Sequence, residues 1–402
     1  MATQQEVLTA GSESELEVEE AVRRRYTAGA RAPQAELCCP AADYEPELLA
    51  AIPEEVIARD YGCGDPTRGL RRGETVLDLG SGSGKACFIA AQRVGPTGRV
   101  IGIDMNDEML ALARRAASEV ARRLGYANVS FRKGRIQDLA LDLEQLEAWL
   151  AEHPVRSGAE LSRLEAKIEQ LRRTTPLVAS ESVDVVISNC VLNLVRPEDK
   201  QRLFCEIHRV LRPGGRAVIS DIVSDEDVPA ELQRDPELWS GCIAGAWRED
   251  RFLEAFERAG LYGITIQKFA AAPWRTAAGI EFRPLTAVAY KGKEGPCLDR
   301  RQAVIYRGPF RTVTDDDGHT YRRGVRTAVC DKTYRLLGRE PYAAHFEPVP
   351  PHQEVPLEQA PPFACEQNAR RDPRETKQGA AAPATPAAAA EPLPACAGPG
   401  CC

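Results

Sequence analysis

The chain has 402 residues, of which 43% are apolar and 28% charged, which is usual for a globular protein of two or three domains. Its formal net charge of −7 disfavours a general nucleic-acid-binding surface. No apolar run approaches the roughly 18 residues that cross a bilayer, and the N-terminus lacks a signal-peptide pattern. We therefore expect a cytoplasmic protein, monomeric, that binds neither nucleic acid nor membrane.

Thirteen cysteines, about 3% of the chain, are too few for a disulfide scaffold. Without a signal for secretion they are expected in a reducing compartment, where cysteines are either inert core residues or chemically employed. Cys87 and Cys205 each lie in an apolar helical pattern, so we predict that both are core residues.

The middle of the chain alternates predicted strands with predicted helices. A helix is expected over 85–94, a second around Met109, Leu110 and Ala113, and a third over 200–210. Such alternation predicts an α/β fold with a doubly wound, mostly parallel, Rossmann-like sheet. The predicted strands are Thr75–Leu79, Arg99–Asp104, 129–132, Val183–Ser188 and Arg216–Ser220.

Two regions depart from this alternation. Leucines at helical spacing over about 140–175 predict a two-helix insertion. Residues 351–402 contain 10 Pro and 13 Ala and predict a disordered tail. The expected organisation is an N-terminal segment over 1–70 with Cys38, Cys39 and Cys63, a cofactor domain over 71–224, a small α+β region over 225–295, a C-terminal extension over 296–350 and the tail.

A glycine-rich turn, Asp78-Leu-Gly80-Ser-Gly82-Ser-Gly84, follows the first predicted strand. Glycines there let the chain turn sharply into a helix and let an anionic group approach the backbone amides. Asp104 closes the next strand, where a carboxylate accepts both hydroxyls of a ribose. The spacing G-x-G-x-G, in place of G-x-G-x-x-G, disfavours a pyrophosphate cofactor.

With these residues the chain resembles the class I S-adenosylmethionine-dependent methyltransferases over about 70–225. The resemblance implies that the amino-acid part of S-adenosylmethionine lies at the glycine turn, the ribose at Asp104 and the adenine near 134–138. The residues expected to bind this cofactor are Tyr61, Asp78, Gly80, Ser81, Gly82, Gly84, Asp104, Met105, Ile136 and Asp138. Tyr61 is either a cation–π partner of the sulfonium or a packed aromatic.

Three cysteines lie in unusual contexts, Y-G-C-G-x-P at Cys63, S-N-C-V-x-N-L at Cys190 and S-G-C-I-A-G-A at Cys242. Cys190 directly follows the fourth predicted strand, at the edge where α/β folds bind their ligands. Thiolates suit a thiophilic ion. The histidines are scattered and no C-x-x-C pair occurs, so zinc is the weaker choice and no metal cofactor is expected.

These three motifs in this order resemble those of the arsenite methyltransferases, from about residue 38 to 291. The resemblance implies that Cys190 and Cys242 hold trivalent arsenic, with Cys63 as a third thiolate. It also implies a disulfide partner for Cys63, either Cys38 or Cys39. The substrates would be arsenite and methylarsenite, and a thiol reductant, glutathione or thioredoxin, would be a co-substrate.

Two other functions are weighed against arsenite methylation. A class I methyltransferase acting on a small organic acceptor would need a general base, for which no strand end offers a candidate. A non-catalytic binder of thiophilic ions would show a damaged cofactor turn, yet its glycines and Asp104 are present.

The C-terminal extension carries short β patterns around a turn over 315–318. The cysteines of the tail, Cys396, Cys401 and Cys402, either deliver arsenite or are dispensable thiols.

Overall fold

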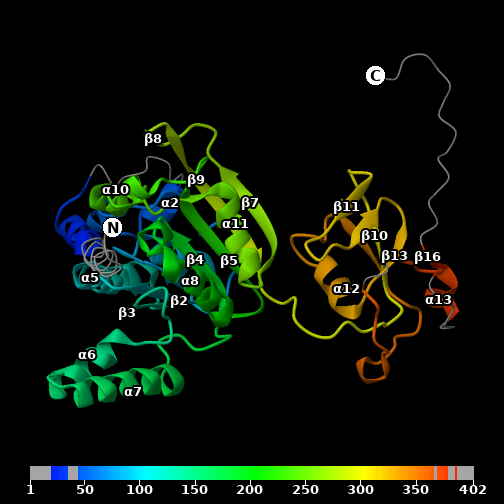
Figure 1. The fold of residues 1–402 in the computed structure, drawn as a ribbon, viewed down its shortest axis with the longest axis horizontal. Helices are drawn as coiled ribbons and strands as arrows, with labels where there is room; N and C mark the ends of the chain where they lie inside the picture. Colours follow the sequence, from blue (N-terminus) through cyan, green and yellow to red (C-terminus); the bar gives the residue numbers. More distant parts are fainter. Residues whose placement is uncertain (1–19, 35–43, 366–368, 379–384, 387–402) are drawn as a thin grey trace, which may run out of the picture. The chain divides into compact units, whose positions relative to one another are not determined.

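The computed structural model describes residues 20–34, 44–365, 369–378 and 385–386. It divides into two compact units, Met1–Gly292 and Lys293–Cys402 (Figure 1). Cys38, Cys39 and the tail cysteines lie outside the described residues. No helix among the described residues is both long enough and apolar enough to cross a membrane.

The first unit is built on one sheet in the strand order β3-β2-β1-β4-β5-β9-β7. Five neighbouring strands of it run parallel, namely β1 (Thr75–Leu79), β2 (Arg99–Asp104), β3 (Val129–Lys133), β4 (Val183–Asn189) and β5 (Leu211–Ser224). β9 (Ile280–Tyr290) runs antiparallel to both its neighbours, β5 and β7 (Tyr262–Phe269). The predicted doubly wound, mostly parallel sheet is therefore confirmed.

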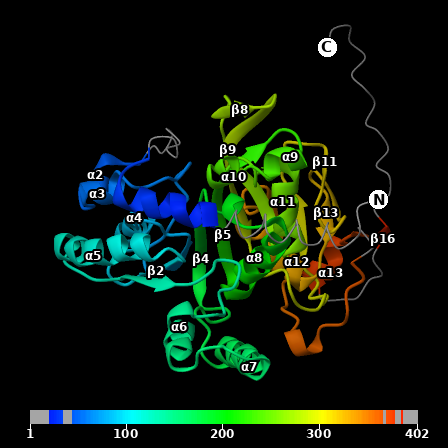
Figure 2. The same cartoon turned by 60° about the vertical axis from the view of Figure 1, so that its left-hand side comes forward.

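Helices cover both faces of this sheet, which is why its central strands are apolar on both sides. α4 (Lys85–Val94) and α5 (Asp107–Leu124) pack on one face, and α8 (Pro197–Val210) and α11 (Glu249–Arg258) on the other (Figure 2). Alternate residues of β1 enter opposite cores, Val76 beneath α4 and Leu77 beneath α8, as the two-residue period of a strand requires.

The region over 225–295 does not form a domain of its own. β9 pairs with β5 from Arg216↔Tyr290 to Ser224↔Phe282, so the region completes the same sheet. Its chain also forms α9 (Ala230–Gln233), α10 (Pro236–Ser240), β6 (Trp247–Arg248) and β8 (Arg275–Ala277). The predicted separation failed because pairing between distant strands leaves no local sequence signal.

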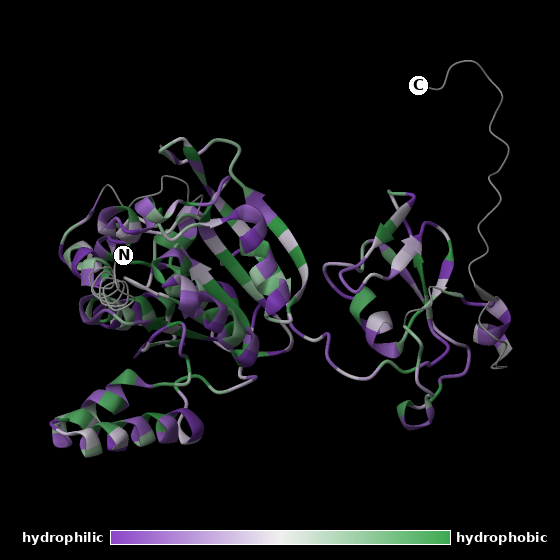
Figure 3. Ribbon diagram, viewed as in Figure 1, coloured by the Kyte–Doolittle hydropathy of each residue, from purple (hydrophilic) through white to green (hydrophobic). Residues whose placement is uncertain are grey.

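The predicted insertion is a pair of helices, α6 (Leu143–Glu152) and α7 (Gly158–Thr174). It extends from the sheet and alternates hydrophobic and hydrophilic residues along its length (Figure 3). A small core of its own joins Leu141, Leu146 and Leu171.

Cys205 is exposed on α8, contrary to prediction, whereas Cys87 is buried as predicted. The buried stripe of α8 is formed by Leu203, Phe204 and Ile207. Cys205 lies two residues after Leu203, which places it about 200° around the helix, on the outer side. The local apolar run around Cys205 was therefore misleading.

The second unit is a small mixed fold around a core that includes Val304, Tyr321 and Phe346. Its elements are β10 (Ala303–Tyr306), β11 (Thr312–Thr314), β12 (Thr320–Arg322), β13 (Arg326–Ala328), α12 (Asp331–Leu337), β14 (Phe346–Val349), β15 (Ala369–Arg370), α13 (Pro373–Gln378) and β16 (Thr385–Pro386). The predicted turn over 315–318 joins β11 to β12.

The predicted disordered tail from residue 351 is wrong for residues 351–365 and 369–378. Arg371 is 4% exposed and bonds Asp299 at 2.6 Å and Glu375 at 2.7 Å, so this stretch is part of the second unit. A composition rich in proline and alanine predicts disorder, but it does not take account of a few buried contacts such as those of Arg371.

The N-terminal part packs against the first unit through a helix over residues 20–31 and two short helices, α2 (Pro46–Leu49) and α3 (Glu54–Ile57). Val56 of α3 is completely buried. The helix over 20–31 was not among the predicted elements.

Candidate active site

A cavity opens at the carboxyl ends of β1, β2 and β4, where the strand order of the sheet reverses. This switch point is where α/β sheets bind ligands. Residues from six chain segments line it, including Val22, Tyr26, Asp60, Tyr61, Asp78, Gly80, Ser81, Gly82, Asp104, Met105, Met109, Ile136, Gln137, Asn189, Cys190 and Arg196.

The glycine turn forms the floor of the cavity. Gly80 and Gly82 have φ angles of 70° and 49°, a left-handed backbone that favours glycine. A Cβ atom on Gly82 would meet nothing within 4 Å, so the backbone there faces open space. A Cβ atom on Gly84 would lie 2.8 Å from the Phe131 ring. Gly84 therefore permits helix α4 to pack closely and does not line the cavity.

Asp104 lies beside this turn with both carboxylate oxygens oriented by the backbone. Its Oδ2 accepts a hydrogen bond from the Gly82 amide at 2.8 Å, and its Oδ1 accepts one from the Asn106 amide at 2.8 Å. Burial raises the pKa of Asp104, although these hydrogen bonds oppose the shift. A carboxylate has about four lone-pair sites, so further acceptor capacity faces the cavity.

Most of the predicted cofactor-binding residues line this one cavity, and Gly84 and Asp138 are the exceptions. Asp138 instead bonds Arg172 at 2.6 Å and Arg202 at 2.9 Å, so it ties the helical insertion to α8. Gln137, its neighbour, lines the cavity in its place. The predicted loop reaches the cavity, but which of two adjacent polar residues lines it depends on the tertiary fold.

Asp78 is 2% exposed at the end of β1 and accepts a hydrogen bond from the Cys87 thiol at 3.1 Å. Burial raises its pKa to about 7, and the hydrogen bond from Cys87 partly opposes this. Between its unfolded pKa of about 3.9 and pH 7, the folded state binds more protons than the unfolded state. Stability contributed by this group therefore falls as pH rises through that window.

We expect Asp78→Asn to remove this loss of stability. From pH 5 to pH 8 the free energy of unfolding of the variant should rise by roughly 3 kcal/mol relative to wild type. All four tryptophans, including Trp239 and Trp274, precede residue 293, so urea unfolding followed by tryptophan fluorescence reports on the first unit. Parallel pH profiles for the two proteins would contradict the assignment of the titrating group.

The Cys63 segment and the Cys190 segment are brought together by one side chain, that of Asn189. Its Oδ1 accepts hydrogen bonds from the amides of Cys63 at 2.9 Å and Gly64 at 3.0 Å, and its Nδ2 donates to the Gly64 carbonyl at 2.8 Å. A Cβ atom on Gly62 would lie 2.1 Å from Asn189, which explains the glycine of that motif. Cys63 and Cys190 are joined by a disulfide, with Cα atoms 5.8 Å apart, so the partner of Cys63 in this structure is Cys190 and not the expected Cys38 or Cys39.

Cys190 and Cys242 share an uncommon backbone conformation, with φ angles of 59° and 61°. For a non-glycine residue this costs about 1–3 kcal/mol and persists only where surrounding contacts impose it. The Cys190 amide donates to the Ser220 carbonyl at 2.8 Å, and the Cys242 thiol donates to the Cys190 carbonyl at 3.4 Å. The Cys242 side chain therefore lies against the backbone of Cys190.

A buried lysine lies near Cys242 and was not predicted. Lys200 on α8 donates to the Gly245 carbonyl and lies 4.7 Å from the Trp247 ring centre. Burial lowers the pKa of Lys200 to about 8, although Asp221 and Cys242 oppose this shift. A cation so placed attracts a Cys242 thiolate, because low dielectric strengthens the interaction.

Asp221 also shapes the Cys190 loop. Its Oδ2 accepts a hydrogen bond from the Leu192 amide at 2.8 Å and its Oδ1 one from the Ile222 amide at 2.8 Å. Burial raises its pKa to about 6, opposed by these hydrogen bonds and by Lys200.

The helix over residues 20–31 covers the cavity on the Cys242 side, a role that sequence reasoning missed. The Tyr26 hydroxyl lies 3.7 Å from the Cys242 sulfur, and its ring packs edge-on against Tyr61 with centroids 6.1 Å apart. The Tyr61 hydroxyl donates to the Gly29 carbonyl at 3.0 Å. Tyr61 therefore both lines the cavity and packs against this helix.

Two family models match the chain. A methyltransferase domain covers residues 70–260, and a domain of unknown function (DUF8838) covers residues 293–381. The two matches fall within the two structural units.

Curated relatives with high similarity are arsenite methyltransferases. One from Aquipseudomonas alcaligenes is 35% identical and aligns over 77% of this chain and 84% of its own length. The human protein is 30% identical and aligns over 77% of this chain and 76% of its own. A crystal structure of an arsenic(III) S-adenosylmethionine methyltransferase from Chlamydomonas reinhardtii matches with 27% identity and a TM-score of 0.49, over 81% of this chain and 99% of that one. Because a curated relative that is 35% identical aligns over 84% of its own length, this chain belongs to the family of arsenite methyltransferases, which are S-adenosylmethionine-dependent enzymes.

Proposed function

We propose that the thiolates of Cys63, Cys190 and Cys242 hold trivalent arsenic as the substrate that this enzyme methylates. One observation carries the proposal: cysteine-bearing segments from three distant parts of the chain meet at the carboxyl edge of the sheet. Asn189 fixes the first two, and Cys242 hydrogen-bonds the Cys190 carbonyl. Soft sulfur donors select thiophilic ions.

The cavity beside these cysteines fits S-adenosylmethionine. Ser81 and Gly82 line the cavity, and a Cβ atom on Gly82 would meet nothing within 4 Å, which leaves room for a ligand beside the turn. Gly80 and Gly82 would accept the amino-acid part and Asp104 the ribose hydroxyls, with Ile136 and Gln137 beside the adenine. When bound, S-adenosylmethionine supplies a methyl group on a positively charged sulfur.

The protein's task is to orient the arsenic. Trivalent arsenic on three thiolates is pyramidal and keeps one lone pair, which attacks the methyl carbon directly. The attacking atom carries no proton, so no general base is required. Three fixed sulfurs hold the lone pair in attack geometry, and positioning of this kind lowers barriers by roughly 7–11 kcal/mol.

Methyl transfer oxidises arsenic to the pentavalent state, and the cysteines can return the electrons. Coupling of the Cys63 and Cys190 sulfurs breaks two As–S bonds, forms one S–S bond and returns two electrons to arsenic. Methylated trivalent arsenic then stays on Cys242, takes a hydroxide from water and releases a proton. The disulfide between Cys63 and Cys190 supports this step, because it joins two of the three ligands.

An external thiol must then reopen the site with two electrons and two protons. Attack by Cys38 or Cys39 on the Cys63 sulfur would move the disulfide to its predicted partner and release Cys190. Glutathione or thioredoxin would complete the reduction, consistent with a cytoplasmic enzyme. Methylarsenite is then the acceptor of a second round.

Omitting the reductant tests this cycle. Enzyme that is first reduced and desalted, then mixed with arsenite and S-adenosylmethionine, should form about one methylated arsenic per chain and stop. Adding glutathione or thioredoxin with its reductase should restart turnover. A Cys205→Ser variant is the matched control, since Cys205 is exposed on α8 and should give the same burst. Many turnovers without any reductant would refute the redox step, and none with reductant would refute the proposed function.

A further inference from the structure

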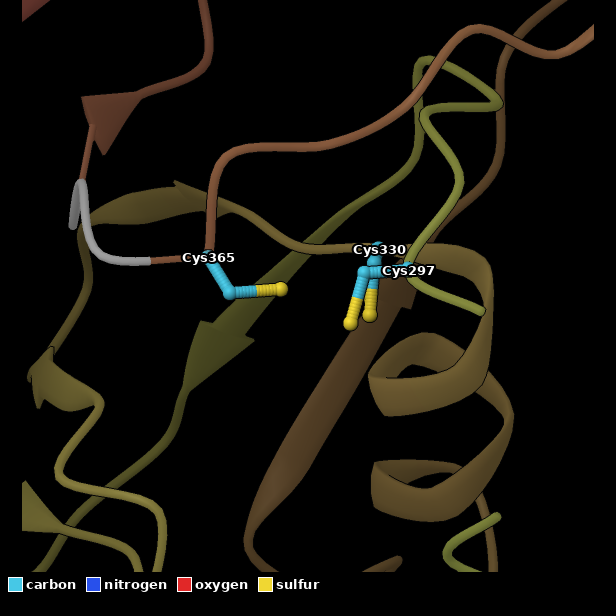
Figure 4. A group of neighbouring side chains, drawn as sticks. All are labelled: Cys297, Cys330 and Cys365. Atoms are coloured by element: carbon cyan, nitrogen blue, oxygen red, sulfur yellow. The ribbon is translucent and has the colours of Figure 1, made fainter. Parts of the chain in front are cut away.

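The second unit contains a group of three cysteines that the proposed active site does not use. The sulfurs of Cys297, Cys330 and Cys365 all lie within 4.8 Å of one another. Figure 4 shows the Cys297 and Cys330 sulfurs pointing the same way, with the Cys365 sulfur directed toward them from another segment. Cys330 is 1% exposed, whereas the other two are half-buried, so an ion can reach the group.

Backbone hydrogen bonds hold the three segments in register. The Phe363 amide donates to the Cys297 carbonyl at 2.9 Å, and the Asp331 amide donates to the Leu298 carbonyl at 2.8 Å. Main-chain hydrogen bonds therefore join residues that are 66 and 33 positions apart in the chain, independently of any bond to the sulfurs. A preorganised arrangement of this kind lowers the entropic cost of binding.

None of the three thiols belongs to the main hydrophobic cluster of this unit, which includes Val304, Tyr321 and Phe346. The hydroxyl of Thr333 lies 3.2 Å from the Cys330 sulfur, and the backbone amide of Thr333 donates to the same sulfur at 3.4 Å. Polar groups of Thr333 thus lie against the Cys330 sulfur.

We propose that Cys297, Cys330 and Cys365 form a second binding site for trivalent arsenic. Zinc in structural sites takes four ligands, and within the part of the chain that the structure describes this group has three. His319 lies on the wall of the adjoining cavity, but its Nδ1 pairs with Asp315 at 3.0 Å and it is not one of the group. Three soft donors match trivalent arsenic, and the choice of arsenic as the ion rests on the proposed function.

Binding is an exchange of ligands without a redox change. Three S–H bonds and the three As–OH bonds of arsenous acid are replaced by three As–S bonds and three water molecules. Arsenic stays trivalent, so the step needs no reductant beyond one that keeps the thiols reduced.

Arsenic stoichiometry tests the site in the full chain. The parent and all variants carry serine in place of Cys396, Cys401 and Cys402. Each protein is reduced with a phosphine, equilibrated with arsenite and separated from unbound arsenic by gel filtration. Cys330→Ser should then retain one arsenic atom fewer per chain than the parent. Cys205→Ser, an exposed thiol on the first unit, should match the parent.

A second variant separates loss of a ligand from loss of folding. Cys365→Ser leaves two thiols, so its affinity for arsenite at this site should fall at least tenfold. Methylarsenite, which offers only two positions for sulfur, should still bind. If Cys365→Ser binds neither arsenite nor methylarsenite at this site and its far-ultraviolet circular dichroism is also reduced, the variant is unfolded. The arsenic count of Cys330→Ser then decides whether the site exists.

Two results would overturn the proposal: an unchanged arsenic count in Cys330→Ser, or one tightly held zinc per chain that arsenite does not displace and that Cys330→Ser loses. Failure of the proposed function is read separately. Cys190→Ser removes an arsenic atom from the first unit only if that site binds arsenic, whatever happens at Cys330.

Discussion

Cys190→Ser should reduce arsenite methylation at least about 100-fold, for the first methyl group as well as later ones. A serine hydroxyl is a hard donor that stays protonated at neutral pH, so the arsenic loses one of three sulfurs and its lone pair is no longer held in one direction. The variant also cannot form the disulfide with Cys63. The measurement is the separation and quantification of arsenic species over time, with excess reductant.

Two controls isolate the role of this thiolate. Cys205→Ser should keep wild-type turnover, because that thiol is exposed on α8. S-adenosylmethionine binding to Cys190→Ser, measured by calorimetry, should persist, because Asp104 and the glycine turn are untouched. Wild-type methylation by Cys190→Ser would exclude the proposed arsenic site and favour a methyltransferase that uses its cysteines structurally.

Asp104→Asn should weaken S-adenosylmethionine binding by roughly 10- to 100-fold, since hydrogen bonds to a charged group contribute about 1.5–3 kcal/mol. The amide nitrogen of asparagine would also face one of the two amides, of Gly82 or Asn106, that now donate to the carboxylate. Isothermal titration with S-adenosylmethionine measures the effect. Arsenite binding should not change, because no arsenic ligand is altered.

Asp142→Asn provides the matched control for that substitution. Asp142 caps α6 by accepting a hydrogen bond from the Gln145 amide at 3.0 Å, outside the cavity. Its S-adenosylmethionine affinity should equal that of wild type. Equal affinity in Asp104→Asn would instead move the ribose away from Asp104 and leave the cavity's ligand unassigned.

The sequence alone was sufficient for the five parallel strands and the glycine turn, because both depend on local patterns. The predicted parts of most parallel strands are short and largely apolar, and the glycine turn over 80–84 is contiguous in the chain. Asp104 follows from the same logic, since the end of β2 must meet the end of β1 in a parallel pair. The three cysteine motifs were recognisable for the same reason.

Contacts between distant segments were not predictable in this way. The positioning side chains Lys200 and Asp221 lie 42 and 21 residues from Cys242, and nothing local distinguishes them from surface charges. The role of the helix over 20–31 was missed because its contacts, such as that between Tyr26 and Cys242, join residues far apart in the sequence. Asp138 was misassigned because a cavity-facing and an outward-facing polar residue look alike in a loop.

Sequence by itself therefore determined the class of the fold, the glycine turn and which cysteines to examine. Tertiary structure alone decided that residues 225–292 complete the main sheet, that Cys63 reaches Cys190, and that Cys297, Cys330 and Cys365 form a group. The physical reason is that a strand, a turn or a helix is selected by neighbours in the chain, whereas a site that gathers sulfurs is selected by the packing of segments far apart in it.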